Sequence, residues 1–95
     1  MNKIIITVVG VDAVGIIASV SSYLAKNKVN ILDISQTVVS GYFNMMMVVD
    51  GSSSAKTFDK LCADLSRIGS DKGVEIRCQK SEIFEKMHRV CDFEK

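Results

Sequence analysis

The fold is decided by the stretch VVGVDAVGIIASV, which occupies Val8–Val20. A β-branched run ends at Gly10, four residues lead to Gly15, and an apolar segment with helical spacing then begins. The spacing of the apolar residues changes from that of a strand to that of a helix. This change predicts a strand, a tight loop and a helix in direct succession. A helix that starts this way presents free backbone N–H groups beside the end of a strand.

The flanking sequence continues the alternation of strands and helices. Strands are predicted at Lys3–Val9, Val29–Val39, Tyr42–Val49 and Val74–Gln79, with a tight turn at Ser40-Gly41. Gly15–Lys28 forms a first helix, with an apolar stripe of Ile16, Ile17, Val20, Tyr23 and Leu24. A second helix carries Phe58, Leu61, Cys62, Leu65 and Ile68, and we expect Gly69–Gly73 to end it. Ser81 caps an expected short last helix with Ile83, Phe84, Met87 and Val90 on one side.

This order, βαββαβ with a helical tail, predicts an α+β, ferredoxin-like fold in one domain spanning residues 1–95. Right-handed crossovers place both helices on one face of a four-stranded antiparallel sheet. The other face is then expected to be uncovered, with Ile5, Val9 and part of Tyr42–Val49 exposed on it. An apolar face of this kind predicts self-association, most simply as a homodimer.

Composition excludes several classes of protein. The formal net charge is +1, so no basic field favours nucleic acid. No segment is long and apolar enough to span a membrane, and the first ten residues do not resemble a signal peptide. Three cysteines without a CxxC pair indicate a reducing compartment, the cytoplasm, rather than a disulfide framework.

The loop does not carry a catalytic motif. Gly10 and Gly15 have the glycine spacing of a P-loop, but isoleucines follow where that loop needs Lys and Ser or Thr. The loop also lacks the arginine of a phosphate-hydrolysing site on this fold. His88 and Cys91 are two ligands at most, which do not make a structural zinc site. We therefore expect no enzymatic activity, no metal and no cofactor.

The same loop can hold a small anion through backbone N–H groups alone. Asp12 has a simpler role as a helix cap, and Asn30 has one as a residue that bonds its own turn. For both residues, these structural roles remain alternatives to a ligand-binding role.

The run GVDAVGIIASVSSYLAKNKVNILDIS, at Gly10–Ser35, resembles the ACT domain, a small regulatory module of βαββαβ order. The resemblance rests on D-x-x-G-I at Asp12–Ile16 and V-N-I at Val29–Ile31. It implies binding of an amino acid or related carboxylate at an interface between subunits. The implied ligand-binding residues are Asp12, Ala13, Val14, Gly15, Ile16, Asn30 and Ile31. Many members have Pro where this chain has Val14.

Within that family the chain is most similar to short stand-alone ACT proteins, which are like the ACT repeats of the glycine-cleavage transcriptional repressor and of formyltetrahydrofolate deformylase. ISQTVVSGYFNMMMVVD, at Ile34–Asp50, and SEIFEKM, at Ser81–Met87, carry this closer similarity. It implies a sensor of a small ligand, with a regulated protein as a further partner. A dimerisation or protein-interaction module without a small ligand remains the alternative.

Overall fold

The structure is a computed structural model that describes residues 2–11 and 15–80. Its elements follow the order β1 (Lys3–Gly10), α1 (Ile16–Lys26), β2 (Asn30–Val39), β3 (Tyr42–Asp50), α2 (Phe58–Lys72) and β4 (Glu75–Lys80). The expected last helix, from Ser81 onward, lies outside the described residues.

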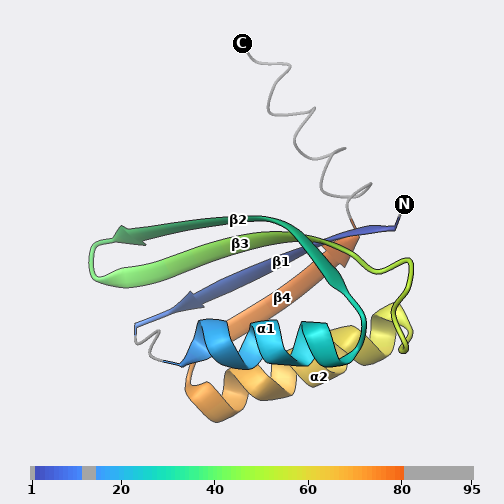
Figure 1. Cartoon of the computed structure of the whole chain (residues 1–95). Coiled ribbons are helices and arrows are strands. Elements are labelled where there is room, and N and C mark those ends of the chain that lie inside the picture. The colour runs from blue at the N-terminus through green and yellow to red at the C-terminus, as the bar shows by residue number, and fades with distance from the viewer. Residues whose placement is uncertain (1, 12–14, 81–95) are drawn as a thin grey trace.

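The four strands form one antiparallel sheet in the order β2-β3-β1-β4. Both helices lie on the same face of this sheet (Figure 1). Ser40 and Gly41 join β2 to β3 with φ of 52° and 81°, the positive values that a two-residue hairpin turn requires. The predicted ferredoxin-like fold is confirmed.

The core lies between the sheet and the helices. Alternate residues of β1 and β3 point into it and meet the apolar stripes of the helices. The most completely buried side chains are Ile6, Ile16, Leu24, Met47, Leu65, Val8, Val20 and Val49. Met45 and Met47 are core residues, whereas Met46 points to the other face and is 37% exposed.

Helix α2 is longer than its sequence suggests. The helix ends within the expected segment Gly69–Gly73, but only at its far end: it passes through Gly69 and ends at Lys72, with Gly73 as a left-handed C-cap at φ 74°. A Cβ on Gly69 would lie 2.8 Å from the backbone oxygen of Val74 and 2.9 Å from Cγ1 of Ile76. Gly69 therefore serves the close approach of α2 to β4 and does not end the helix.

Exposed apolar side chains lie only partly where the sequence places them. Ile5 lies on the sheet face opposite the helices, as expected, but it is only 5% exposed, so its predicted exposure is wrong. Val9 is exposed as expected, and so are Tyr42 and Met46 of the predicted strand Tyr42–Val49. Most of the exposed apolar surface instead follows the outer strand and its hairpin, in a group that we name the β2 edge patch: Leu32, Ile34, Val38, Val39 and Tyr42.

Candidate functional site

The N-terminus of α1 is the first part of the candidate site. Gly15 caps the helix with φ 78°, a left-handed conformation that side chains rarely adopt. The first helical bond runs from the N–H of Ser19 to the carbonyl of Gly15, at 3.0 Å. The N–H groups that precede it in the helix have no intrahelical acceptor, and the first turn carries no acidic side chain. This end of α1 is therefore electropositive and suits an anion.

Lys72 adds a positive charge at the same place. Its Nζ lies 3.9 Å from the point that a Cβ on Gly15 would occupy. Lys72 belongs to the last turn of α2, where a cation also stabilises the helix dipole. The sequence analysis missed this residue because it treated Gly69–Gly73 as a break. Only the fold brings the end of α2 beside the start of α1 (Figure 1).

The loop residues contribute unequally. Asp12, Ala13 and Val14 lie outside the described residues. The side chain of Ile16 is fully buried in the core, so only its backbone can contact a ligand. Gly15 and the start of α1 are thus the described part of the predicted loop site.

Asn30 and Ile31 lie at the other end of the molecule. Asn30 is exposed and pairs with Asp50, which itself pairs with Lys3 at the beginning of β1. The loop that leads to Gly15 follows Gly10, at the end of β1. Seven residues of strand separate these two levels of the sheet, a distance of about 23 Å. One copy of the chain therefore does not bring the two halves of the predicted site together.

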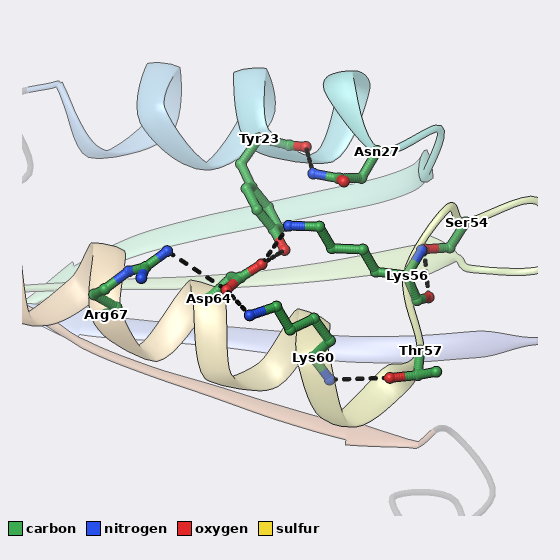
Figure 2. Close-up of polar contacts among 8 residues, drawn as sticks. All are labelled: Tyr23, Asn27, Ser54, Lys56, Thr57, Lys60, Asp64 and Arg67. Carbon is green, nitrogen blue, oxygen red and sulfur yellow. Dashed lines mark hydrogen bonds and ion pairs between the residues drawn. The ribbon is translucent and has the colours of Figure 1, made fainter.

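A charged cluster joins the two helices and is shown in Figure 2. Asp64 of α2, only 3% exposed, accepts a hydrogen bond from the Tyr23 hydroxyl at 2.5 Å and one from the Lys56 ammonium at 2.7 Å. Lys60 and Arg67 lie 3.6 and 3.5 Å from its other oxygen. The Lys56 ammonium also lies 5.4 Å from the centre of the Tyr23 ring.

The pKa values of Asp64 and Tyr23 are typical of a structural contact rather than of a catalytic pair. The bonded Lys56 ammonium and Tyr23 hydroxyl hold the pKa of Asp64 well below its usual range. Burial, and then the hydrogen bond to Asp64, raise the pKa of Tyr23 well above its usual range. A carboxylate that stays ionised and a phenol that stays protonated do not exchange protons near neutral pH. The cluster therefore fixes α1 against α2.

The described cysteines are not activated. Burial raises the pKa of the Cys78 thiol and also that of Cys62, so both are protonated near neutral pH. Within residues 2–11 and 15–80, no three His, Cys, Asp or Glu side chains are grouped closely enough to hold a metal ion. The described surroundings give neither thiol a catalytic partner.

Comparison with known proteins now identifies the family. The family model described as "ACT domain" matches residues 2–79. The chain belongs to the ACT domain family. ACT domains are typically regulatory modules that bind ligands. The match begins before β1 and ends within β4, so it covers the first five elements completely and β4 up to residue 79.

Similar proteins agree with this assignment. A UPF0237 protein of Bifidobacterium longum is 59% identical over 90 residues, which cover 95% of this chain and 100% of that protein. An ACT domain protein from Streptococcus pneumoniae superposes with a TM-score of 0.78 at 45% identity, covering 88% of this chain and 94% of that one. A glycine cleavage system transcriptional repressor shares the fold alone, with a TM-score of 0.70 at 20% identity, over 83% of this chain and 45% of that one. The resemblance drawn from the sequence is confirmed.

Neither described helix of this ACT domain has the length and apolar character needed to cross a membrane.

Proposed function

We propose that the chain is a non-catalytic, cytoplasmic regulatory module that binds a small carboxylate, most simply an amino acid, at the N-terminus of α1. The observation that carries the proposal is the pairing of Gly15 with Lys72. A carboxylate placed there meets N–H groups that have no acceptor within the helix on one side and an ammonium group on the other. The regulatory character of the ACT family supports the same conclusion.

A homodimer would complete the site. β2 is an outer strand of the sheet, and the β2 edge patch lies along it. Antiparallel pairing of two β2 strands about a two-fold axis near Ser35 sets Asn30 of the second copy opposite Val39. Val39 lies at the end of the sheet that holds the loop before α1. The proposed ligand therefore contacts Gly15 and Ile16 of one copy and Asn30 and Ile31 of the other.

Regulation then follows from linkage. A ligand that contacts both copies stabilises the dimer. The free energy of this stabilisation cannot exceed the difference between the ligand's binding free energies for the paired and the unpaired states. A regulated protein that recognises the pair would sense the ligand through this equilibrium.

The β2 edge patch also favours the second candidate function, a dimerisation module without a small ligand. Several apolar side chains remain exposed along β2, an edge strand that pairs on one side only, and such an edge is a typical place for chain association. Pairing through this strand does not need a ligand. The two functions differ in what the α1 terminus does.

Thermal unfolding against a panel of amino acids separates them. A ligand present at about a hundred times its dissociation constant adds roughly 2.7 kcal/mol of stability. In a domain of this size, that raises the melting temperature by on the order of ten degrees. We expect such a rise for one or a few compounds. No rise with any compound, in a protein that light scattering shows to be dimeric, would support the dimerisation module.

Gly15→Asp should abolish that rise, because it places a negative charge where the carboxylate binds. Gly15→Asn is the matched control: it has nearly the same shape, and both residues tolerate a left-handed backbone better than others. We expect the Asn variant to retain more affinity than the Asp variant at equal folded fraction, measured by calorimetric titration. Equal affinity of the two variants would place the ligand elsewhere.

Val38→Lys should weaken the dimer. Val38 is 71% exposed on β2, so the monomer tolerates a lysine at this position. In the dimer, each copy would place one such charge at the edge where the two β2 strands pair. Ser66→Lys adds the same charge on the exposed surface of α2 and is the control. Sedimentation should show a dimer for the control and a monomer for Val38→Lys at the same concentration. A dimer that persists unchanged in Val38→Lys would exclude this edge.

A further inference from the structure

Two cysteine side chains meet between α2 and β4, and the proposed function uses neither of them. Cys62 lies on α2 and Cys78 on β4, and both are half-buried free thiols. Cys78 pairs with Ile6, a core residue, so its side chain lies on the sheet face that the helices cover. The thiol groups of Cys62 and Cys78 hydrogen-bond to each other. The fold therefore brings two thiols from different elements into direct contact.

Two contacts that flank the thiols place them opposite each other independently. Toward the end of α2, Gly69 lies against Ile76, whose Cγ1 is 2.9 Å from the point that a Cβ on Gly69 would occupy. At the start of α2, the centre of the Phe58 ring lies 5.3 Å from the Lys80 ammonium. The cysteine of β4 is midway between the two strand residues on the same face. The cysteine of α2 lies between the two helix residues at helical spacing, so it shares their side of the helix.

The close approach of α2 to β4 suits a disulfide. An added Cβ on Gly69 would lie 2.8 Å from the backbone oxygen of Val74, so the helix packs directly on the strand. A disulfide requires two Cβ atoms that lie about 3.5–4.5 Å apart, which only closely packed elements provide. Because an S–S bond is about 2 Å long, two sulfurs in hydrogen-bonding contact need to approach by roughly 2 Å more. A movement of this size is within the reach of side-chain rotation.

The two thiols differ in the ease with which they ionise. Burial is the largest cause of the raised pKa at both of them. The hydrogen bond between them, however, lowers the pKa of Cys62 and raises that of Cys78. Cys62 therefore ionises first, and its thiolate accepts a hydrogen bond from the Cys78 thiol. Since the thiolate is the nucleophile, Cys62 reacts first, and it reacts slowly near neutral pH because most of it is protonated.

We propose that Cys62 and Cys78 form a reversible disulfide within one copy of the chain when a peroxide oxidises the protein. The Cys62 thiolate attacks hydrogen peroxide, the O–O bond breaks, hydroxide leaves, and Cys62 becomes a sulfenic acid. The Cys78 sulfur then attacks the sulfenic sulfur, so that the S–S bond forms and the S–O bond breaks. The oxygen leaves as water with the proton of Cys78. In total, two thiols give two electrons and two protons to the peroxide, which becomes two molecules of water. A dithiol reductant reverses the modification by thiol–disulfide exchange.

Single variants test the order of the two steps. Cys78→Ser leaves the sulfenic acid of Cys62 without a thiol to attack it, so this acid should accumulate and be labelled by dimedone. Cys62→Ser is the matched variant, in which Cys78 should be labelled several-fold less at an equal folded fraction. Equal labelling of the two variants would overturn the assignment of Cys62 as the first thiol to react.

Thermal unfolding tests whether the bond fits the native packing. A disulfide between positions 62 and 78 removes conformational freedom mainly from the unfolded chain. We expect oxidation to raise the melting temperature by on the order of ten degrees, and dithiothreitol to reverse the rise. Cys62→Ser, treated with the same peroxide, should show no rise. A disulfide that forms without raising the melting temperature would overturn the placement of the two thiols in native contact.

Peptide mapping of the full-length, folded protein after treatment with hydrogen peroxide is the decisive experiment. Trypsin separates the two cysteines onto the peptides Leu61–Arg67 and Cys78–Lys80, and it leaves Cys91 on a third peptide. We expect the first two peptides to be joined by a disulfide, in a chain that keeps the mass of a monomer under denaturing conditions. The joined peptides should form faster at about pH 9 than at about pH 7, because more thiolate is present.

Two results of this mapping would overturn the proposal. The first is that Cys62 and Cys78 stay reduced, or are oxidised separately, at both pH values. The second is that the joined peptides occur only in a covalent dimer, which would place the bond between two copies of the chain.

Discussion

Gly69→Ala is expected to destabilise the domain, although alanine in a helix is normally more stable than glycine by about 1 kcal/mol. The added methyl group would lie 2.8 Å from the backbone oxygen of Val74, an atom that cannot rotate away. Helix α2 must then move off β4, which loosens the packing of Leu65 and Ile76 in the core. Overpacking of this kind typically costs about 1–3 kcal/mol. In a domain of this size, each kcal/mol lowers the melting temperature by about 4–8 °C.

Ser70→Ala is the matched control for this prediction. Ser70 is the next residue of α2, and it is exposed. The same methyl-bearing residue there meets no strand, so we expect a small change in the free energy of unfolding, measured by denaturant titration. If Gly69→Ala were as stable as Ser70→Ala, the close approach of α2 to β4 would be wrong.

Asp64→Ala is expected to have the largest effect of any polar substitution. It leaves the Tyr23 hydroxyl and the Lys56 ammonium without their shared acceptor. Removing one partner of a buried charged group is strongly destabilising, because the remaining groups lose their compensation. We expect a fall in melting temperature on the order of ten degrees. Tyr23→Phe removes one hydrogen bond and keeps the ion pairs, so it should cost less.

The pH dependence of stability distinguishes charge from shape at Asp64. Its pKa is lower in the folded protein than in the unfolded chain, so its contribution is complete above the unfolded value of about 4. This contribution to stability is lost as the pH falls from the pKa of Asp64 in the unfolded chain toward its lower pKa in the folded protein. The stability difference between the wild type and Asp64→Asn should therefore shrink as the pH is lowered below about 4. A difference that stays constant down to pH 2 would show that the charge contributes nothing.

Local patterns were enough to predict the elements and most of the core. The alternation of Ile4, Ile6 and Val8 and the helical spacing of Ile16, Val20 and Leu24 express periodicities that hold within one element. Both sets are buried together. The placement of both helices on one face of the sheet follows from the handedness of the crossovers, which does not depend on the particular side chains.

What the sequence did not predict depends on contacts between distant elements. Gly69 resembles a helix terminator until β4 is placed against it. Lys72 joins the α1 terminus only because α2 ends there, and Asp64 meets Tyr23 across 41 positions of sequence. Likewise, the motif that contains Gly15 and the motif that contains Asn30 are close in sequence but lie at opposite ends of the sheet. The proposed joint binding of a ligand by both motifs would require a second copy.

The central claim is that the α1 terminus binds a small carboxylate between two copies of the chain. The most direct test is to follow the backbone amide resonances of the full-length protein while amino acids are added one at a time. The account predicts that one ligand shifts Gly15, Ile16 and Asn30 together, with a single dissociation constant. Shifts confined to other parts of the chain, such as Thr7 and Met46 on the sheet face opposite the helices, or no shifts with any amino acid, would contradict it.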